Sequence, residues 1–310
     1  HAAGLPRMVS MNVCTDQLLL TLADPEQIIG LSRFSRGGWQ SLSANDMRRY
    51  PVLSGGAEDV LLAKPDIVVA SLFDKRSTRE LLKAKGLHLA ELAVPRTLAE
   101  ARLQIREAGD ITGHPDRAAA EIARLDAALA RARGAAAERH YRVLPLSRRG
   151  WVAGSDSFVG SLLTETGLLN AAGDLGFSFG GFASLEAIVS LRPDFIVVSQ
   201  AGNHASDEGQ AFLLHPALER FYPPAKRIVI PERMTECGGV MLADCSGRTD
   251  GGIEAGGAVG SSYKCFVVHA NAGTHNHRML ELKGGVGHCF YPSAPRRMGP
   301  CVRRDDRYHP

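Results

Sequence analysis

Apolar residues in this chain gather in short runs, and stretches with helical spacing separate one run from the next. The runs Ile67–Ala70 and Phe195–Ser199 each follow a Pro-Asp pair directly. Adjacent β-branched and aromatic residues are typical of strands that are buried on both faces of a parallel sheet. Segments such as Ala57–Ala63 and Thr78–Lys85 carry apolar residues at helical spacing and end close to a proline or a glycine. This alternation predicts an α/β fold in which helices cover parallel sheets.

The same reading assigns further elements along the chain. The segment Ser32–Tyr50 is polar and glycine-containing, so we expect a loop there. The first helix is expected to have Thr15 or Asp16 as its N-cap residue and to end before Pro25. The other expected strands are Arg7–Val13, Ile28–Leu31, Leu87–Leu92, Arg142–Leu146 and Arg227–Ile230, and the other expected helices are Ser157–Thr166 and Gln210–Phe221.

One sequence unit occurs twice. Residues 58–69 read Glu-Asp-Val-Leu-Leu-Ala-Lys-Pro-Asp-Ile-Val-Val, and residues 186–198 read Glu-Ala-Ile-Val-Ser-Leu-Arg-Pro-Asp-Phe-Ile-Val-Val. The spacing of the two copies is far longer than the roughly 20–50 residues of solenoid repeats. It indicates two similar lobes, each with its own core. Within the unit, the Pro-Asp pair is interpreted as turn chemistry between a helix and a buried strand.

A long alanine-rich segment lies between the two copies. Ala118–Arg139 has Ile122, Leu125 and Leu129 at helical spacing and contains no proline. It predicts one long helix that connects the lobes as a stiff spacer, so the lobes should move little relative to each other. The alternative is a helix that packs on the first lobe alone. The predicted domains are an N-terminal lobe (1–112), the connecting helix (113–141) and a C-terminal lobe (142–244).

Residues 245–310 differ in character from the rest of the chain. They contain four of the six cysteines and five of the eleven histidines, are rich in glycine, and show no sustained helical period. We expect an anomalous, poorly ordered tail that arises either from a change of reading frame or as a divergent extension. The cysteines lack C-x-x-C spacing, so no disulfide or zinc framework can be assigned from the sequence. The histidines of the tail lack a convincing ligand spacing, and no metal site is predicted there.

Charge and hydropathy exclude some partners. The formal net charge of +3 is too small to indicate binding to nucleic acid or to an anionic membrane. No run approaches the roughly 18 apolar residues of a membrane-spanning helix. The chain starts at His1, and we expect a processed product, which is compatible with removal of a secretory signal.

Glu58 and Glu186 occupy equivalent positions in the two copies of the repeat. Each is expected in the first turn of a helix, where the helix macrodipole favours a carboxylate. That electrostatic effect is a sufficient explanation of both residues. Equivalent exposed charges on two lobes could also dock a two-fold symmetric partner, and the residues alone leave both explanations open.

The run Met11–Leu20, the doubled Glu…Lys/Arg-Pro-Asp unit and the long central helix together resemble the class III periplasmic substrate-binding proteins. Those proteins serve ABC importers of cobalamin, ferric siderophores and haem. The resemblance covers about residues 7–243. It implies two Rossmann-like lobes with parallel sheets joined by one long α-helix, a metal-chelate ligand between the lobes and no cofactor.

The resemblance also implies a partner and a location. Glu58 and Glu186 are expected to meet arginines on the two subunits of an inner-membrane ABC permease. The protein itself is expected to be a monomer in the periplasm, either free or lipid-anchored.

The ligand site follows from the topology, because ligands approach parallel sheets at the carboxyl ends of the strands. Loops at those ends carry aromatic side chains, which suit the flat face of a macrocycle or catechol, and arginines, which suit carboxylate or phosphate groups. Trp151 is the leading candidate, because its glycine-flanked turn opens the second lobe. The predicted ligand-binding residues are Arg33, Trp39, Phe73, Arg148, Arg149, Trp151 and Met234.

Two other functions were weighed. A thiol- or cofactor-dependent enzyme with two Rossmann-like lobes would use Cys14, which we expect between a strand and a helix, where a thiol can be activated. A small buried structural cysteine is the competing interpretation, and the common hydrolase, P-loop and dinucleotide motifs are absent from the sequence. A receptor for bare manganese or zinc would need several His, Asp or Glu ligands, and the loops named above contain too few histidines.

Overall fold

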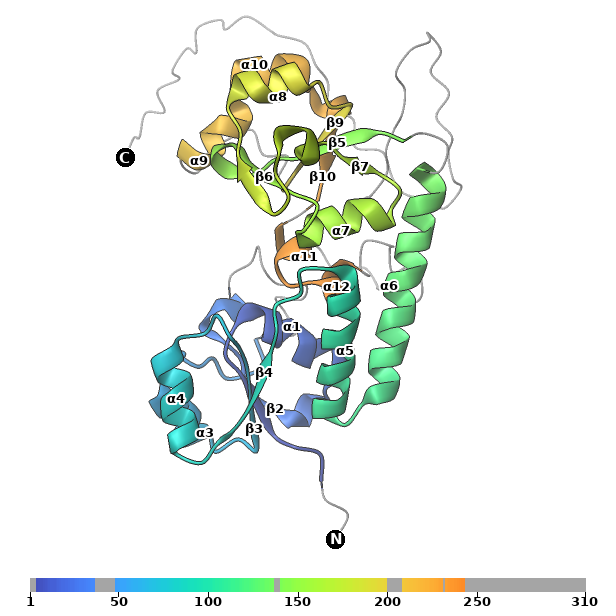
Figure 1. The fold of residues 1–310 in the computed structure, drawn as a ribbon. Coiled ribbons are helices and arrows are strands. Elements are labelled where there is room, and N and C mark those ends of the chain that lie inside the picture. Colours follow the sequence, from blue (N-terminus) through green and yellow to red (C-terminus); the bar gives the residue numbers. More distant parts are fainter. Residues whose placement is uncertain (1–3, 37–47, 137–139, 200–207, 231, 243–310) are drawn as a thin grey trace, which may run out of the picture. The chain divides into compact units, whose positions relative to one another are not determined.

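The computed structural model describes residues 4–36, 48–136, 140–199, 208–230 and 232–242 (Figure 1). All of them belong to the first of two compact units, His1–His269, and the second unit is Ala270–Pro310. Trp39 and the tail 245–310 lie outside the described residues, so their predicted roles stay predictions.

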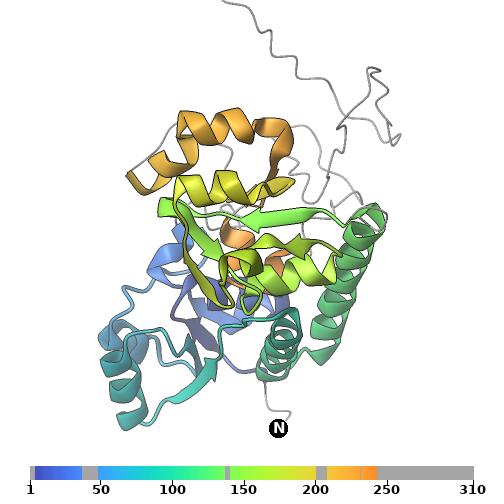
Figure 2. The same cartoon turned by 45° about the horizontal axis from the view of Figure 1, so that its top comes forward.

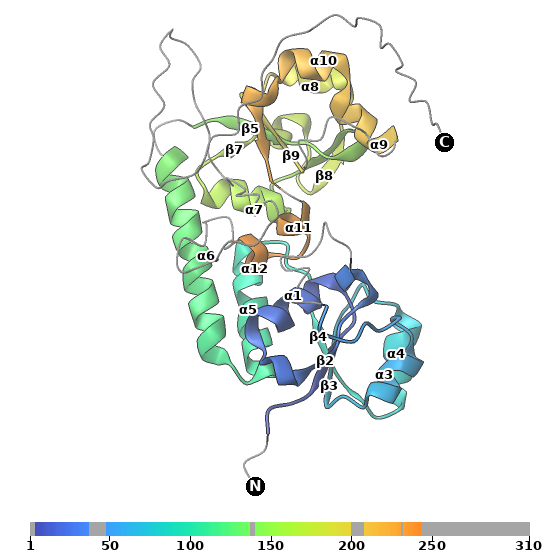
Figure 3. The same ribbon diagram turned by 180° about the vertical axis from the view of Figure 1, so that it is seen from behind.

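The first lobe is built on a parallel sheet with the strand order β2-β1-β3-β4. Helices cover both faces of this sheet, with α3 and α4 on one face and α1 and α5 on the other (Figures 1 and 3). Alternate residues of β3 serve the two faces, because Val68 and Ala70 join one apolar cluster and Val69 joins the other. The strands are β1 (Met8–Ser10), β2 (Ile28–Gly30), β3 (Ile67–Ser71) and β4 (His88–Leu92), and the helices are α1 (Val13–Leu22), α3 (Ala57–Ala63), α4 (Arg76–Ala84) and α5 (Leu98–Thr112).

The second lobe repeats this topology. Its parallel sheet has the order β10-β9-β5-β7, which is the order of the first sheet when β5, β7, β9 and β10 are matched with β1, β2, β3 and β4. Among the described strands, none of one sheet pairs with a strand of the other. The predicted fold of two Rossmann-like lobes is therefore confirmed. The strands are β5 (Arg142–Pro145), β7 (Leu169–Asn170), β9 (Phe195–Val198) and β10 (Arg227–Val229), and the helices are α7 (Phe158–Glu165), α8 (Leu185–Leu191), α9 (Glu208–Ala211) and α10 (Pro216–Phe221).

The predicted long helix is α6 (Pro115–Ala136), which joins the two lobes. It runs beside α5, as the views in Figures 1 and 2 agree. The turn between the two helices uses Gly113, whose φ of +75° is in the left-handed region that favours glycine. Gly109 permits the close approach, since a Cβ there would lie 2.5 Å from the Cβ of Ala118.

Several element boundaries differ from the sequence-based expectation. The first strand ends at Ser10, and α1 begins at Val13, because the N-cap is Asn12, whose side chain accepts hydrogen bonds from the N–H groups of Cys14 and Thr15. The expected helix Gln210–Phe221 is divided into α9, a 3-10 turn and α10. The residue before Pro216 is extended (φ −60°, ψ 131°), as a residue before proline prefers.

Other elements were not predicted. Besides α5, they include a two-stranded antiparallel sheet in the second lobe, made of β6 (Trp151–Ala153) and β8 (Gly180–Phe182). The chain also continues beyond β10 into α11 (Glu232–Glu236) and α12 (Gly239–Leu242). Although α12 follows the second lobe in sequence, it packs on α1, α5 and α6.

Candidate functional site

The Pro-Asp turn of the repeat performs the same structural task in both lobes. The Asp66 carboxylate accepts the N–H of Arg7 at 2.7 Å, and the Asp66 N–H donates to the Arg7 carbonyl at 2.8 Å. Asp194 makes the same pair of bonds with Arg142, both at 2.8 Å. Each aspartate thus fastens the helix-to-strand turn to the residue that precedes or opens the central strand of its sheet. These contacts support the structural interpretation of the motif.

Glu58 and Glu186 are both exposed and both occupy the second position of their helices, α3 and α8. No ion pair to either carboxylate is found among the described residues. A hydrogen bond with its own backbone N–H and one with Ser184 lower the pKa of Glu186, and nearby His215 acts in the same direction. The two lobes therefore present exposed acidic groups at equivalent places.

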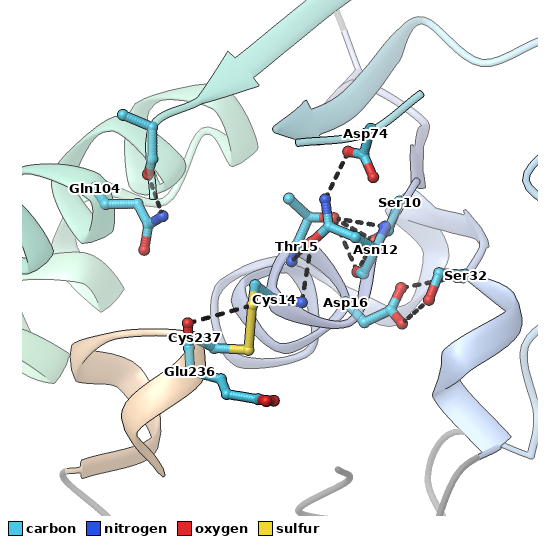
Figure 4. The surroundings of a disulfide bond; sticks show 11 residues. Ser10, Asn12, Cys14, Thr15, Asp16, Ser32, Asp74, Gln104, Glu236 and Cys237 are labelled. Carbon is cyan, nitrogen blue, oxygen red and sulfur yellow. Dashed lines mark hydrogen bonds between the residues drawn. A yellow bond between two sulfur atoms is a disulfide. The ribbon is translucent and has the colours of Figure 1, made fainter. Parts of the chain in front are cut away.

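The carboxyl edge of the first sheet carries a polar network (Figure 4). Asn12 caps α1 with its side-chain oxygen and donates through Nδ2 to Asp74 Oδ2 at 2.7 Å. The same Asp74 oxygen accepts the N–H of Ser71 at 2.7 Å. The ends of β1 and β3 are thus tied to each other and to the start of α1.

Asp16 anchors the next loop along this edge. Its carboxylate is fully buried and accepts both the N–H and the hydroxyl of Ser32, at 2.8 and 2.6 Å. Burial raises the pKa of Asp16, and its hydrogen bonds with Ser10 and Ser32 oppose that shift. Arg33 follows directly. It is exposed, with its guanidinium 4.8 Å from the ring centroid of Phe34.

Phe73 lies in the turn after β3 and is 83% exposed. Neighbouring Leu72 is 61% exposed. The first lobe therefore displays apolar side chains at the carboxyl end of β3, as the sequence analysis expected for Phe73.

The candidate residues of the second lobe gather around the antiparallel strand pair β6–β8. Arg148 and Arg149 lie in a 3-10 turn that follows β5, and Arg149 has a left-handed φ of 57°. Trp151 opens β6 and meets Phe182 edge to face, with ring centroids 5.0 Å apart. A Cβ at Gly180 would lie 2.5 Å from Trp151, so the ring depends on a glycine on the partner strand.

Phe179 and Phe182 are 59% and 66% exposed, and the sequence analysis did not single them out. The run Phe-Ser-Phe-Gly-Gly-Phe at 177–182 was the available signal, since glycines within a strand often mark a close approach by another group. Phe182 extends the aromatic surface that begins at Trp151.

Met234 differs from the other predicted ligand residues. It lies in α11, is 2% exposed and belongs to the largest apolar cluster, which contains residues of both lobes and of the helices between them. In this conformation it offers almost no surface to a ligand.

Cys14 and Cys237 form a disulfide that the sequence did not reveal (Figure 4). Cys14 is in the first turn of α1, and Cys237 follows α11. The two are 223 residues apart, and with four more cysteines in the chain no pairing could be derived. Cys14 is half-buried and paired in a disulfide, which favours the structural interpretation of this residue, and the enzyme hypothesis loses its free thiol in this structure.

The sequence model of the periplasmic binding protein family matches residues 8–227. The chain belongs to this family. Members of this family are binding proteins of the periplasm. No curated protein matches the chain as a relative.

Solved structures of similar fold include two haem-binding proteins and one protein of a transport system. The periplasmic haem-binding protein RhuT from Roseiflexus sp. RS-1 is 24% identical, with a TM-score of 0.62, and the match covers 78% of this chain and 97% of that one. A periplasmic haem-binding protein from Pseudomonas aeruginosa is 22% identical (TM-score 0.61, covering 77% and 90%). An ABC-type Fe3+-hydroxamate transport protein from Saccharomonospora viridis is 20% identical (TM-score 0.59, covering 78% and 91%). At sequence identities below 25%, these similarities show that the chain shares the fold of these proteins and nothing more.

A hollow of about 550 Å³ lies away from the strand ends, against α5, α6 and α7. Arg102 of α5 crosses its wall and pairs with Asp126 of α6 and Glu165 of α7. None of the predicted ligand residues lines this hollow, which belongs to the packing of the joining helices.

The described residues contain neither a metal-binding cluster nor a membrane-spanning helix. Within the described ranges, no group of three or more His, Cys, Asp or Glu side chains is arranged to hold a metal ion. None of the helices found there combines the length and apolar character that crossing a membrane requires.

Proposed function

We propose that this protein is a periplasmic receptor that captures a metal chelate and delivers it to an inner-membrane ABC importer. The observation that carries the proposal is the duplicated lobe: two sheets of identical strand order, each with exposed aromatic and cationic side chains beyond its strand ends. Membership in the periplasmic binding protein family supports the class of function. The names of similar structures, which bind haem or serve Fe3+-hydroxamate transport, support the class of ligand.

The side chains at the strand ends suit such a ligand. Trp151, Phe182 and Phe73 offer flat apolar faces, which pack well on a macrocycle or catechol ring. Arg33 and Arg149 provide guanidinium groups for carboxylate or phosphate decorations. Trp39 and Arg148 remain candidates from the sequence. Recognition requires no covalent step, and the ligand brings its own metal.

Delivery is assigned to Glu58 and Glu186, the exposed acids at matching positions of the two lobes. A permease made of two similar subunits would offer two similar basic sites, and one carboxylate per lobe fits that arrangement. Docking of this kind needs only one copy of the receptor, which is consistent with a monomer.

The test of chelate capture uses the two tryptophans of the chain, Trp39 and Trp151. In a Trp39→Phe variant the emission comes from Trp151 alone, and titration with a ferric siderophore, haem and cobalamin should quench it saturably with one of the three. We expect a dissociation constant of about 1 μM or below, because a largely preformed site limits the ordering cost.

The control is the matched Trp151→Phe variant, whose remaining emission comes from Trp39. Binding measured by ligand absorbance should weaken in the Trp151→Phe variant. If none of the three chelates changes the emission of either protein, and none co-elutes with the wild type in gel filtration, chelate capture is ruled out.

A further inference from the structure

The turn Ser71–Asp74, which carries Phe73, is held by several hydrogen bonds. Within it, the N–H of Asp74 donates to the Ser71 carbonyl at 3.1 Å, and the N–H of Phe73 lies 3.3 Å from Ser71 Oγ. The Asp74 carboxylate accepts the N–H of Ser71 and the side-chain amide of Asn12, both at 2.7 Å. The turn is thereby fixed to itself and to the cap of α1, as Figure 4 shows for Asn12 and Asp74.

Arg79 adds a second anchor from α4. Its Nε donates to the Asp74 carbonyl at 3.1 Å, and its Nη2 lies 3.3 Å from the Leu72 carbonyl. The side chain is 9% exposed and also pairs with Glu91 on β4. A buried guanidinium therefore joins two carbonyl groups of the turn, those of Leu72 and Asp74, to the edge of the sheet.

The side chains of this restrained turn contrast with its backbone. Phe73 and Leu72 project outward and are among the more exposed large apolar residues of the described chain. Exposed apolar side chains add nothing to the core, whereas a rigid apolar contact favours binding because little ordering is needed when a ligand arrives.

We propose that Arg79 and Asp74 are positioning residues, which hold the turn Ser71–Asp74 so that Leu72 and Phe73 form a preorganised apolar contact for the chelate. This inference rests on the proposed function. It goes beyond it in assigning a role to residues that do not themselves touch the ligand.

The chain provides a matched control on the same helix. Lys83 pairs with the same Glu91 carboxylate, at 2.8 Å, and within the described part of the chain no hydrogen bond joins it to the turn. Arg79→Met leaves Glu91 paired with Lys83 and removes the bonds to the turn carbonyls. Lys83→Met leaves Glu91 paired with Arg79 and keeps those bonds. A difference between the two variants therefore reports on the turn.

The first measurement needs no ligand. Hydrogen exchange of the Phe73 and Asp74 amides should accelerate roughly tenfold in Arg79→Met and stay within about twofold of the wild type in Lys83→Met. The amides of Val68 and Val69 in β3 serve as the reference for global unfolding, and their exchange should not change.

The second measurement is affinity for the chelate that binds the wild type. Arg79→Met should raise the dissociation constant roughly tenfold and Lys83→Met less than about twofold. In a Phe73→Ala background, Arg79→Met should have little further effect, because the contact that it positions is gone. Asp74→Asn, a smaller change, should give an intermediate rise and serves as the test if Arg79→Met does not fold.

The outcomes separate the two proposals. If Phe73→Ala weakens binding but Arg79→Met and Asp74→Asn do not, chelate capture stands and the positioning role is overturned. The positioning role is also overturned if Arg79→Met and Lys83→Met exchange equally at the turn. If the wild type binds no chelate, the proposed function and this inference are both removed.

Discussion

At the residue scale, the doubled motif separates into a structural part and an exposed part. Asp66 and Asp194 each make two short bonds at the start of a strand: the carboxylate accepts a backbone N–H, and the backbone N–H of the aspartate donates to a carbonyl. Lys64 and Arg192, just before the prolines, both adopt a left-handed conformation that ends their helices. Glu58 and Glu186 make no comparable contact and are exposed in both copies. The two carboxylates are therefore exposed to solvent and accessible to a binding partner.

Charge reversal tests the docking role of Glu58 and Glu186. The double variant Glu58→Lys and Glu186→Lys should bind the chelate like the wild type, because no contact between either carboxylate and a predicted ligand residue is found in the described part of the chain. Uptake by cells that carry the importer should fall at least about tenfold, since like charges would now face the permease. The residual docking of single variants should weaken further as salt rises.

The control for that experiment changes net charge equally at another exposed place. Glu107→Lys with Asp110→Lys alters two exposed acids of α5 that are outside the repeat. Uptake should be retained in this control. Equal uptake by the two double variants would contradict docking through Glu58 and Glu186.

At the scale of elements, the sequence predicted those strands and helices whose positions depend on short-range patterns of residues. The buried strands and the helices of the repeat follow from apolar runs bounded by proline and glycine, and they were located to within a few residues. The strand pair that presents Trp151 was missed, because α7 and β7 separate β6 from β8 in the chain and because two of the three residues of β8 are glycines, on which the rings of Trp151 and Phe177 pack. The N-cap of the first helix was predicted at Thr15 or Asp16, because both residue types are common N-caps, whereas the structure has it at Asn12.

The candidate site was predictable to a similar degree. Loops at strand ends could be named from topology, and Phe73, Arg33, Arg149 and Trp151 do lie at such ends. Burial could not be read from sequence, so Met234 was included although it packs in the core. Contacts between distant segments, such as the bond from the Asn12 side chain to Asp74, leave no local pattern.

Helix α7 of the second lobe is connected to the helix pair α5–α6 by side-chain bonds, and we call this contact the joint. Arg102 of α5 binds Glu165 with two bonds, at 3.1 and 2.9 Å, and binds Asp126 of α6 at 2.8 Å. These carboxylates raise the pKa of Arg102 further above its usual range. The N–H of Leu98 donates to Ser161 Oγ at 3.1 Å across the same contact. One side chain thus ties three helices.

Arg102→Met should lower the free energy of unfolding by about 1–2 kcal/mol, because a bidentate charge-assisted pair at a partly exposed site is lost. Urea denaturation measures this change. Arg117→Met is the matched control: it removes an arginine of α6 that pairs with Asp24 but does not touch α7, and its side chain is 45% exposed against 21% for Arg102. The control should lose about half as much or less. A larger loss in the control would contradict the importance of the joint.

At the scale of the whole molecule, the chain returns to its beginning. After β10, the last described helix α12 packs on α1, α5 and α6, and Val240 and Leu242 join the apolar cluster that contains Leu18 and Leu22. The backbone approaches closely there, since a Cβ at Gly239 would lie 2.7 Å from Leu125. The Cys14–Cys237 disulfide makes this return covalent. Disulfides persist in oxidising compartments, which agrees with a periplasmic protein.

Because this disulfide closes a loop of 223 residues, it should restrict the unfolded chain strongly. The loop-entropy relation gives a stabilisation of about 5 kcal/mol as an upper value, and losses of about 2–5 kcal/mol are typical. The double variant Cys14→Ala and Cys237→Ala should therefore unfold at a clearly lower denaturant concentration than the oxidised wild type. Reductant should lower the midpoint of the wild type to a similar degree and leave that of the double variant unchanged, which isolates this bond from the four cysteines of the tail. If the double variant and the oxidised wild type unfold at the same midpoint, the return of the chain is maintained by packing alone, and the disulfide contributes nothing to the stability of the fold.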